Sequence, residues 1–110
     1  MDVEKNKLQL DKLKLLQYAD NFDPAEYNSF IRTTASMLEY MLDFYGNEKN
    51  VFQSEEERLE IVKQLQECLD IYHEYLKVFG YLNKEGSDKK AELAKKFFST
   101  IGKYICYWWD

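Results

Sequence analysis

The chain has 110 residues, a formal net charge of −5 and 45% hydrophobic residues, among them nine Tyr, seven Phe and two Trp. This content excludes a disordered tail, and the length suits one domain with a real core. One proline and four glycines leave long uninterrupted stretches, which favours helices over a turn-rich β fold.

The first residues show no secretory signal, and no apolar run approaches the ~18 residues that a membrane-spanning helix needs. We therefore expect no membrane span and a cytoplasmic location.

The first predicted helix spans residues 2–18. Its leucines fall on two stripes, with Leu10, Leu13 and Leu16 on one and Leu8 and Leu15 on the other. The pattern therefore leaves open which side of this helix is buried.

The second predicted helix spans residues 24–45. Asp23 is placed as its N-cap, Pro24 as its first residue and Glu26 as the third, which completes a capping box. Gly46 is expected to end the helix in the left-handed conformation that glycine tolerates.

Two further helices are predicted, over residues 55–79 and 88–108. Ser54 and Glu57 form a capping box for the third helix, and Gly80 is expected to end it. Ser87 or Asp88 is expected to cap the fourth. The sequence thus predicts an all-α fold, a four-helix up-and-down bundle in a single domain over residues 1–110.

The second helix carries more apolar surface than one bundle needs. Its core stripe consists of Tyr27, Ile31, Leu38, Leu42 and Tyr45. A second stripe, well rotated from the first, consists of Phe30, Met37, Tyr40 and Phe44. A helix that is apolar on two sides is either central in its domain or meets another chain.

The C-terminal helix shows a similar surplus. Its predicted core stripe consists of Ala94, Phe97, Phe98, Ile101, Ile105 and Trp108, while Tyr107 and Trp109 fall outside it. Exposed Tyr and Trp are typical anchors of protein interfaces. Trp109 could instead fold back over the end of the bundle, and the sequence does not separate the two arrangements.

Residues suited to catalysis are scarce. His73 is the single histidine, and the segment Asp70 to His73 gives only one imperfect copy of the Glu-x-x-His pattern of di-iron bundles. Cys68 and Cys106 form no redox motif; Cys68 is expected to be buried and Cys106 exposed. We therefore expect no enzyme activity, no cofactor and no metal site.

The charge is unevenly distributed, with −8 in residues 17–83, +1 in residues 1–16 and +2 in residues 84–110. The acidic middle suits a basic partner. The alternative is a helical nucleic-acid-binding protein that uses Lys89, Lys96, Lys103 and Tyr104 of the fourth helix. Its negative net charge makes nucleic acid the less favoured partner.

The function expected from these patterns is protein binding. The second helix, through Phe30, Met37, Tyr40 and Phe44, and the C-terminal helix, through Tyr107 and Trp109, would occlude the surface of a target or form a homodimer. Regulators and inhibitors from phages, plasmids and other mobile elements share this size and class. They include anti-defence proteins and four-helix immunity proteins against toxins, although no motif specifies either type.

Overall fold

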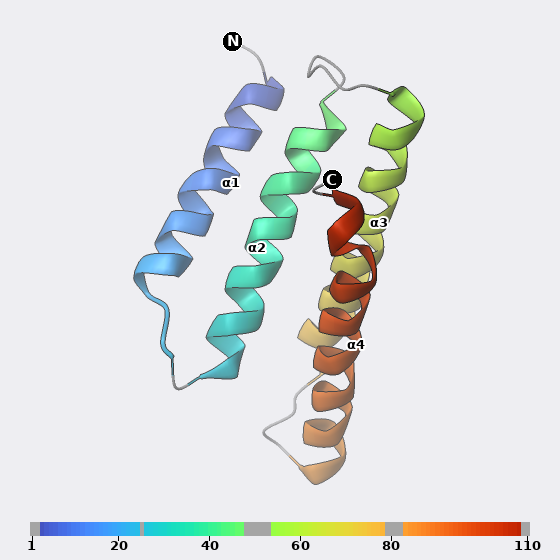
Figure 1. Ribbon diagram of the computed structural model, residues 1–110. Coiled ribbons are helices and arrows are strands. Elements are labelled where there is room, and N and C mark those ends of the chain that lie inside the picture. Colours follow the sequence, from blue (N-terminus) through green and yellow to red (C-terminus); the bar gives the residue numbers. More distant parts are fainter. Residues whose placement is uncertain (1–2, 25, 48–53, 79–82, 109–110) are drawn as a thin grey trace. The chain divides into compact units, whose positions relative to one another are not determined.

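The structure is a computed structural model that describes residues 3–24, 26–47, 54–78 and 83–108. These residues form four helices and no strand: α1 (Val3–Asp20), α2 (Tyr27–Gly46), α3 (Glu55–Leu76) and α4 (Lys84–Trp108) (Figure 1). The predicted all-α class with four helices is confirmed. No helix among the described residues is long and apolar enough to cross a membrane.

The chain divides into two compact units, residues 1–65 and residues 66–110, with the division inside α3. The N-terminal unit holds α1, α2 and the first half of α3. The C-terminal unit holds the second half of α3 and α4. The expectation of a single domain over residues 1–110 stays a prediction.

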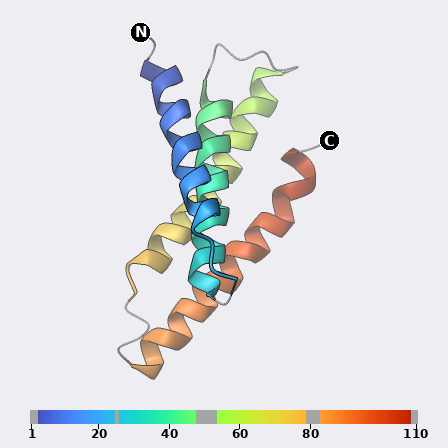
Figure 2. The same cartoon turned by 90° about the vertical axis from the view of Figure 1, so that its left-hand side faces the viewer.

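In the N-terminal unit, α1 and α2 run antiparallel alongside each other, as both views show (Figures 1 and 2). Two ion pairs join them: Lys7 pairs with Asp43, and Lys14 Nζ lies 3.2 Å from Glu39 Oε2. The guanidinium of Arg32 on α2 also lies 4.8 Å from the centre of a tyrosine ring on α1, a distance at which a cation attracts the ring face.

The predicted start of the second helix at residue 24 is wrong, because α2 begins at Tyr27. The Glu26 N–H donates to the Asp23 carbonyl at 3.1 Å, the hydrogen bond of a turn that begins at Asp23. Asp and Pro are favoured at the first two positions of a β-turn as well as at a helix start. Glu26 occupies the N-cap position without a side-chain capping bond.

The helix ends also differ from the predictions. α1 continues to Asp20, and α2 includes Gly46 as its last residue. None of the described glycines has a positive φ, so the expected left-handed ending at Gly46 is wrong. α3 ends at Leu76, short of the predicted residue 79; Phe79 and Gly80 lie outside the described residues.

The predicted start of the third helix is confirmed. α3 begins at Glu55, and the Glu57 N–H donates to Ser54 Oγ at 3.3 Å. Glu55, Glu56 and Glu57 occupy the first turn, where carboxylates stabilise the positive end of the helix dipole.

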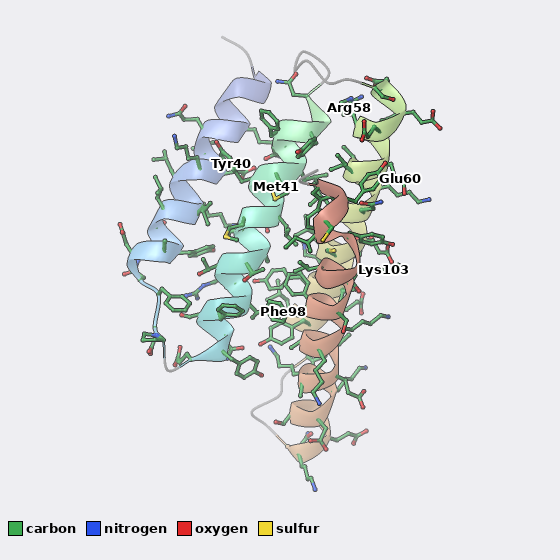
Figure 3. All side chains as sticks on the ribbon, viewed as in Figure 1. Tyr40, Met41, Arg58, Glu60, Phe98 and Lys103 are labelled. Atoms are coloured by element: carbon green, nitrogen blue, oxygen red, sulfur yellow. The ribbon has the colours of Figure 1, made fainter. Side chains whose placement is uncertain are left out.

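Arg58 joins the first turn of α3 to the end of α2 (Figure 3). Its side chain is 4% exposed. It donates to the Tyr45 carbonyl at 2.8 Å and makes two hydrogen bonds to the Glu55 carboxylate. This buried charge thus donates to a carbonyl in the last turn of α2, where helices run out of their own N–H donors.

The core of the C-terminal unit is aromatic. Tyr72 stacks on Tyr75 with ring centroids 6.1 Å apart and lies 5.8 Å from the Phe97 ring of α4. Lys90 Nζ lies 3.8 Å from the centre of the Tyr75 ring. Partial burial lowers the pKa of Lys90, while the ring face attracts its ammonium group.

The fourth helix begins earlier than predicted, at Lys84 instead of residue 88. Asn83 is its cap, because Asn83 Oδ1 accepts a hydrogen bond from the Gly86 N–H at 2.7 Å. Neither Ser87 nor Asp88 caps the helix; both lie within its first turns.

Most predicted core positions are buried or half-buried. On the third helix, the helical period predicts a core stripe of Ile61, Val62, Leu65, Cys68, Leu69, Tyr72, Leu76 and Phe79. Its members from Ile61 to Tyr72 are buried, except Val62, which is half-buried. Three are wrong, since Tyr27 and Leu76 are more than half exposed and Ile105 is 37% exposed. All three stand in the first or last turn of a helix, where few neighbouring turns remain to cover them. Ile71 and Tyr75 are buried although the predicted stripe omitted them.

Candidate protein-binding surface

Three exposed apolar side chains of α2 lie in one line along the helix. Phe30, Met37 and Phe44 are 52%, 44% and 40% exposed. They recur every seventh residue, so they lie within about 40° of one another around the helix axis. These three residues are called the α2 stripe below. Tyr40, the fourth predicted member, is half-buried; Figure 3 labels it on α2.

Another side of α2 supplies the core. Ile31, Ala35 and Leu38 are each at most 3% exposed, and they lie well around the helix from the α2 stripe. The helix therefore buries one apolar side and leaves the other in water. Three of the four residues of the second stripe seen in the sequence are thus exposed, and their role in binding stays a prediction.

The turn between α1 and α2 extends this surface. The Phe22 ring lies 6.5 Å from the Phe30 ring in an edge-to-face arrangement. Phe22 and Tyr27 are both exposed. The apolar surface thus continues from the α2 stripe to the N-terminal end of α2.

The C-terminal aromatics differ in exposure. Tyr107 is exposed and Trp108 is buried, as the helical projection predicts. Trp109 lies outside the described residues, so its two alternative placements stay open. Tyr107 is on the C-terminal unit, and we treat it separately from the α2 stripe.

The lysine face proposed for nucleic-acid binding is exposed on α4. Lys89, Lys96 and Lys103 are all exposed, and in Figure 3 Lys103 and Phe98 project to different sides of α4. Tyr104, however, donates its hydroxyl to Glu67 Oε2 at 2.6 Å, and this bond raises the pKa of the tyrosine. Tyr104 is therefore engaged with α3 within the C-terminal unit.

An open groove of about 470 Å³ lies between α3 and α4 in the C-terminal unit. It is lined by Asp70, Ile71, His73, Glu74, Lys77, Leu93 and Lys96. Glu74 and Lys77 form an ion pair at 3.1 Å. Among the described residues, no group of three or more His, Cys, Asp or Glu side chains is placed so that it could hold a metal ion.

The cysteines lie as predicted, with Cys68 buried and Cys106 exposed. Burial raises the pKa of the Cys68 thiol to about 11, with the neighbouring Glu67 carboxylate adding to the shift. At neutral pH Cys68 is therefore a protonated, unreactive core residue.

Comparison with protein-family models, with curated proteins and with solved structures finds no match to this chain.

Sequence reasoning missed two features of the N-terminal unit. It left the facing of α1 open, and the structure turns Leu10, Leu13 and Leu16 outward. It also gave no role to Arg58. Lys7 and Lys14 each pair with an acidic residue of α2. These pairs can be recognised only once the two helices are known to be neighbours.

Proposed function

We propose that this chain is a non-enzymatic protein-binding regulator or inhibitor that covers a surface of its partner with the α2 stripe. The observation that carries the proposal is the exposure of Phe30, Met37 and Phe44 in one line on a helix whose core side is already buried. Large apolar side chains that lie together in water are typical of interaction surfaces.

The energetics suit a binding site. Full burial of such a side chain contributes about 1.5–3 kcal/mol, and roughly half of that remains available at each half-exposed position. The three residues of the α2 stripe would thus supply a few kcal/mol, and Phe22 and Tyr27 would extend the contact. That gain must exceed the entropy lost on association, so a partner with a complementary apolar groove is required.

The charge of the chain favours a basic partner. Residues 1–65 carry the whole net charge of −5, whereas residues 66–110 are neutral overall. An acidic N-terminal unit would attract a basic partner and speed its association, and added salt would slow this step.

Within the class of small regulators, the types that share the chain's size and all-α fold are anti-defence proteins and toxin-immunity proteins of phages, plasmids and other mobile elements. Size and fold class support this narrower proposal. The homodimer through α2 that the sequence also allows would occupy the same stripe, so the two uses exclude each other.

The test compares two variants that each place a carboxylate at an exposed apolar position. Met37→Glu lies in the α2 stripe, whereas Leu59→Glu lies on α3, where Leu59 is 52% exposed. Each variant and the wild-type chain are immobilised and exposed to a lysate of the cells that encode the chain. The proposal predicts one protein retained by wild type and Leu59→Glu and lost from Met37→Glu. Equal retention by all three would contradict it.

A lysate also tests the nucleic-acid alternative, which the exposed lysines of α4 support. Changing Lys96 and Lys103 together to Glu would abolish retention of nucleic acid and leave retention of a protein partner nearly intact. If the Lys96 and Lys103 variant no longer retains what the wild type retains, and Met37→Glu still retains it, the nucleic-acid alternative is favoured.

A further inference from the structure

Three leucines of α1 face outward, while two of its lysines reach carboxylates on α2. Leu10, Leu13 and Leu16 are 64%, 55% and 51% exposed. Lys7 and Lys14 pair with carboxylates on α2, although both side chains remain largely in water. An amphipathic helix at the edge of a protein normally buries its leucines.

The outward strip of α1 is almost free of charge. Gln9 and Gln17 are exposed and border the three leucines. These five residues, Gln9, Leu10, Leu13, Leu16 and Gln17, are called the leucine face below. Asp20, seven residues after Leu13, projects onto the same side of the helix, but it lies beyond the leucine face at the C-terminal end of α1, where it is exposed. Depletion of charge marks the core of a protein interface.

The sequence of this segment is nearly symmetric about Leu13. Residues 9–17 read Gln-Leu-Asp-Lys-Leu-Lys-Leu-Leu-Gln, which is the same from either end except for Asp11 and Leu15. Both exceptions are half-buried and lie off the leucine face. Two residues at the same number of positions before and after Leu13 project from the helix at equal and opposite angles from the direction of Leu13. The leucine face is therefore symmetric in residue type and in geometry.

We propose that the leucine face binds the leucine face of a second copy of this chain, in an antiparallel helix pair with a two-fold axis at Leu13. Such an axis sets Leu13 against its own copy, and Leu10 level with Leu16 of the second copy. Gln9 comes level with Gln17 of the second copy. Glutamine amides both donate and accept hydrogen bonds, so they can pair with one another, whereas like charges would repel.

The contact is small, so the dimer is weak. α1 has 18 residues and is about 27 Å long, with a helix width of about 10 Å. One such helix face buries less than the ~800 Å² per partner of a standard interface. Association therefore depends on concentration.

This dimer leaves the α2 stripe free. Met37 and Glu39 are two positions apart, so they point to nearly opposite sides of α2, and Glu39 is on the side that meets α1. The inference therefore does not rest on the proposed partner binding.

The sharpest test is disulfide trapping. Helix axes that pack at 8–10 Å leave about 3.4–5.4 Å between facing Cα atoms, overlapping the range that a disulfide spans. Leu13→Cys, in a Cys106→Ser background, is expected to form a covalent dimer at least about tenfold faster than Leu59→Cys in the same background, because the pairing raises the effective thiol concentration. Equal rates for the two positions would overturn the proposal.

Sedimentation over a range of concentrations gives the second test, with circular dichroism to verify the helix content of each variant. The wild type, Met37→Glu and Leu59→Glu should self-associate, and Leu13→Glu should stay monomeric. Mixing Leu13→Glu with Leu13→Lys should restore a dimer. A wild type that is monomeric throughout would overturn the proposal, and so would a dimer that Met37→Glu breaks and Leu13→Glu does not.

Discussion

Arg58 is a buried cation whose partners differ in their access to water. The Tyr45 carbonyl, in the last turn of α2, accepts a hydrogen bond from Arg58 and is on a half-buried residue, whereas the Glu55 side chain is 66% exposed. Loss of the guanidinium would leave Glu55 hydrated but the carbonyl without this donor. The cost should therefore be that of one hydrogen bond to a charged donor, below the cost of stranding a buried charge.

We expect Arg58→Met to lower the free energy of unfolding by about 1–3 kcal/mol, with urea denaturation as the measurement. Methionine keeps much of the apolar stem and removes the donors. Arg58→Lys should fall between, because an ammonium cannot hold the fork geometry to both partners. As a control, the exposed Lys63→Ala should change the free energy of unfolding by less than about 0.5 kcal/mol. Equal stability of wild type and Arg58→Met would contradict this role.

The same pair predicts a dependence on pH. The hydrogen bond from Arg58 holds the pKa of Glu55 below its ordinary value of 4.5. A lowered folded-state pKa stabilises the fold above the unfolded-state value, and the contribution disappears as pH falls through the folded-state value. Titration of the Glu55 carboxyl by NMR should give a midpoint below 4.5 in the wild type and a higher midpoint in Arg58→Met. Identical midpoints would show that the pair does not form in solution.

At the scale of helices, local sequence signals identified the elements better than their ends. Ser54 was recognised as a cap because Glu57 stands three residues after it, at the spacing of a capping box. Asp23 and Pro24 fit both a helix start and a β-turn, and only the bond from Glu26 to the Asp23 carbonyl decides between them. Asn83 was missed because Gly86 and Ser87, poor residues for a helix interior, follow it directly.

Gly102 offers a test of α4. It is exposed in the helix interior, has no positive φ, and an added Cβ would meet nothing within 4 Å. Gly102→Ala should therefore raise the free energy of unfolding by about 0.5–1 kcal/mol, measured by urea denaturation. Gly46→Ala is the matched comparison, since its Cβ is equally free of contacts but lies at the last residue of α2. A smaller gain is expected there; a loss of stability at Gly102 would contradict the geometry.

At the scale of the whole molecule, periodicity predicted the exposed stripe on α2 but not the leucine face on α1. Phe30, Met37 and Phe44 stand out because a clear core stripe already occupies another side of α2. On α1 the leucines at two sets of positions balance each other, so projection alone gives no inside. The contacts of α1 with α2, including the pairs of Lys7 and Lys14 with carboxylates, join residues distant in sequence, so projection of one helix does not include them.

We propose two separate uses for the two apolar faces, the α2 stripe for a partner protein and the leucine face for a second copy of the chain. They share the N-terminal unit, which also carries the net negative charge of the chain. Self-association and partner binding would then occur together, and a dimer would present two α2 stripes.

Hydroxyl-radical footprinting over a range of protein concentrations tests this account most directly, since it reports the solvent access of individual side chains. As concentration rises, Leu10, Leu13 and Leu16 should become protected, while Phe30, Met37 and Phe44 should remain as reactive as in dilute protein. Protection of the α2 stripe together with the leucines, or in their place, would mean that self-association consumes the stripe, and would contradict the account.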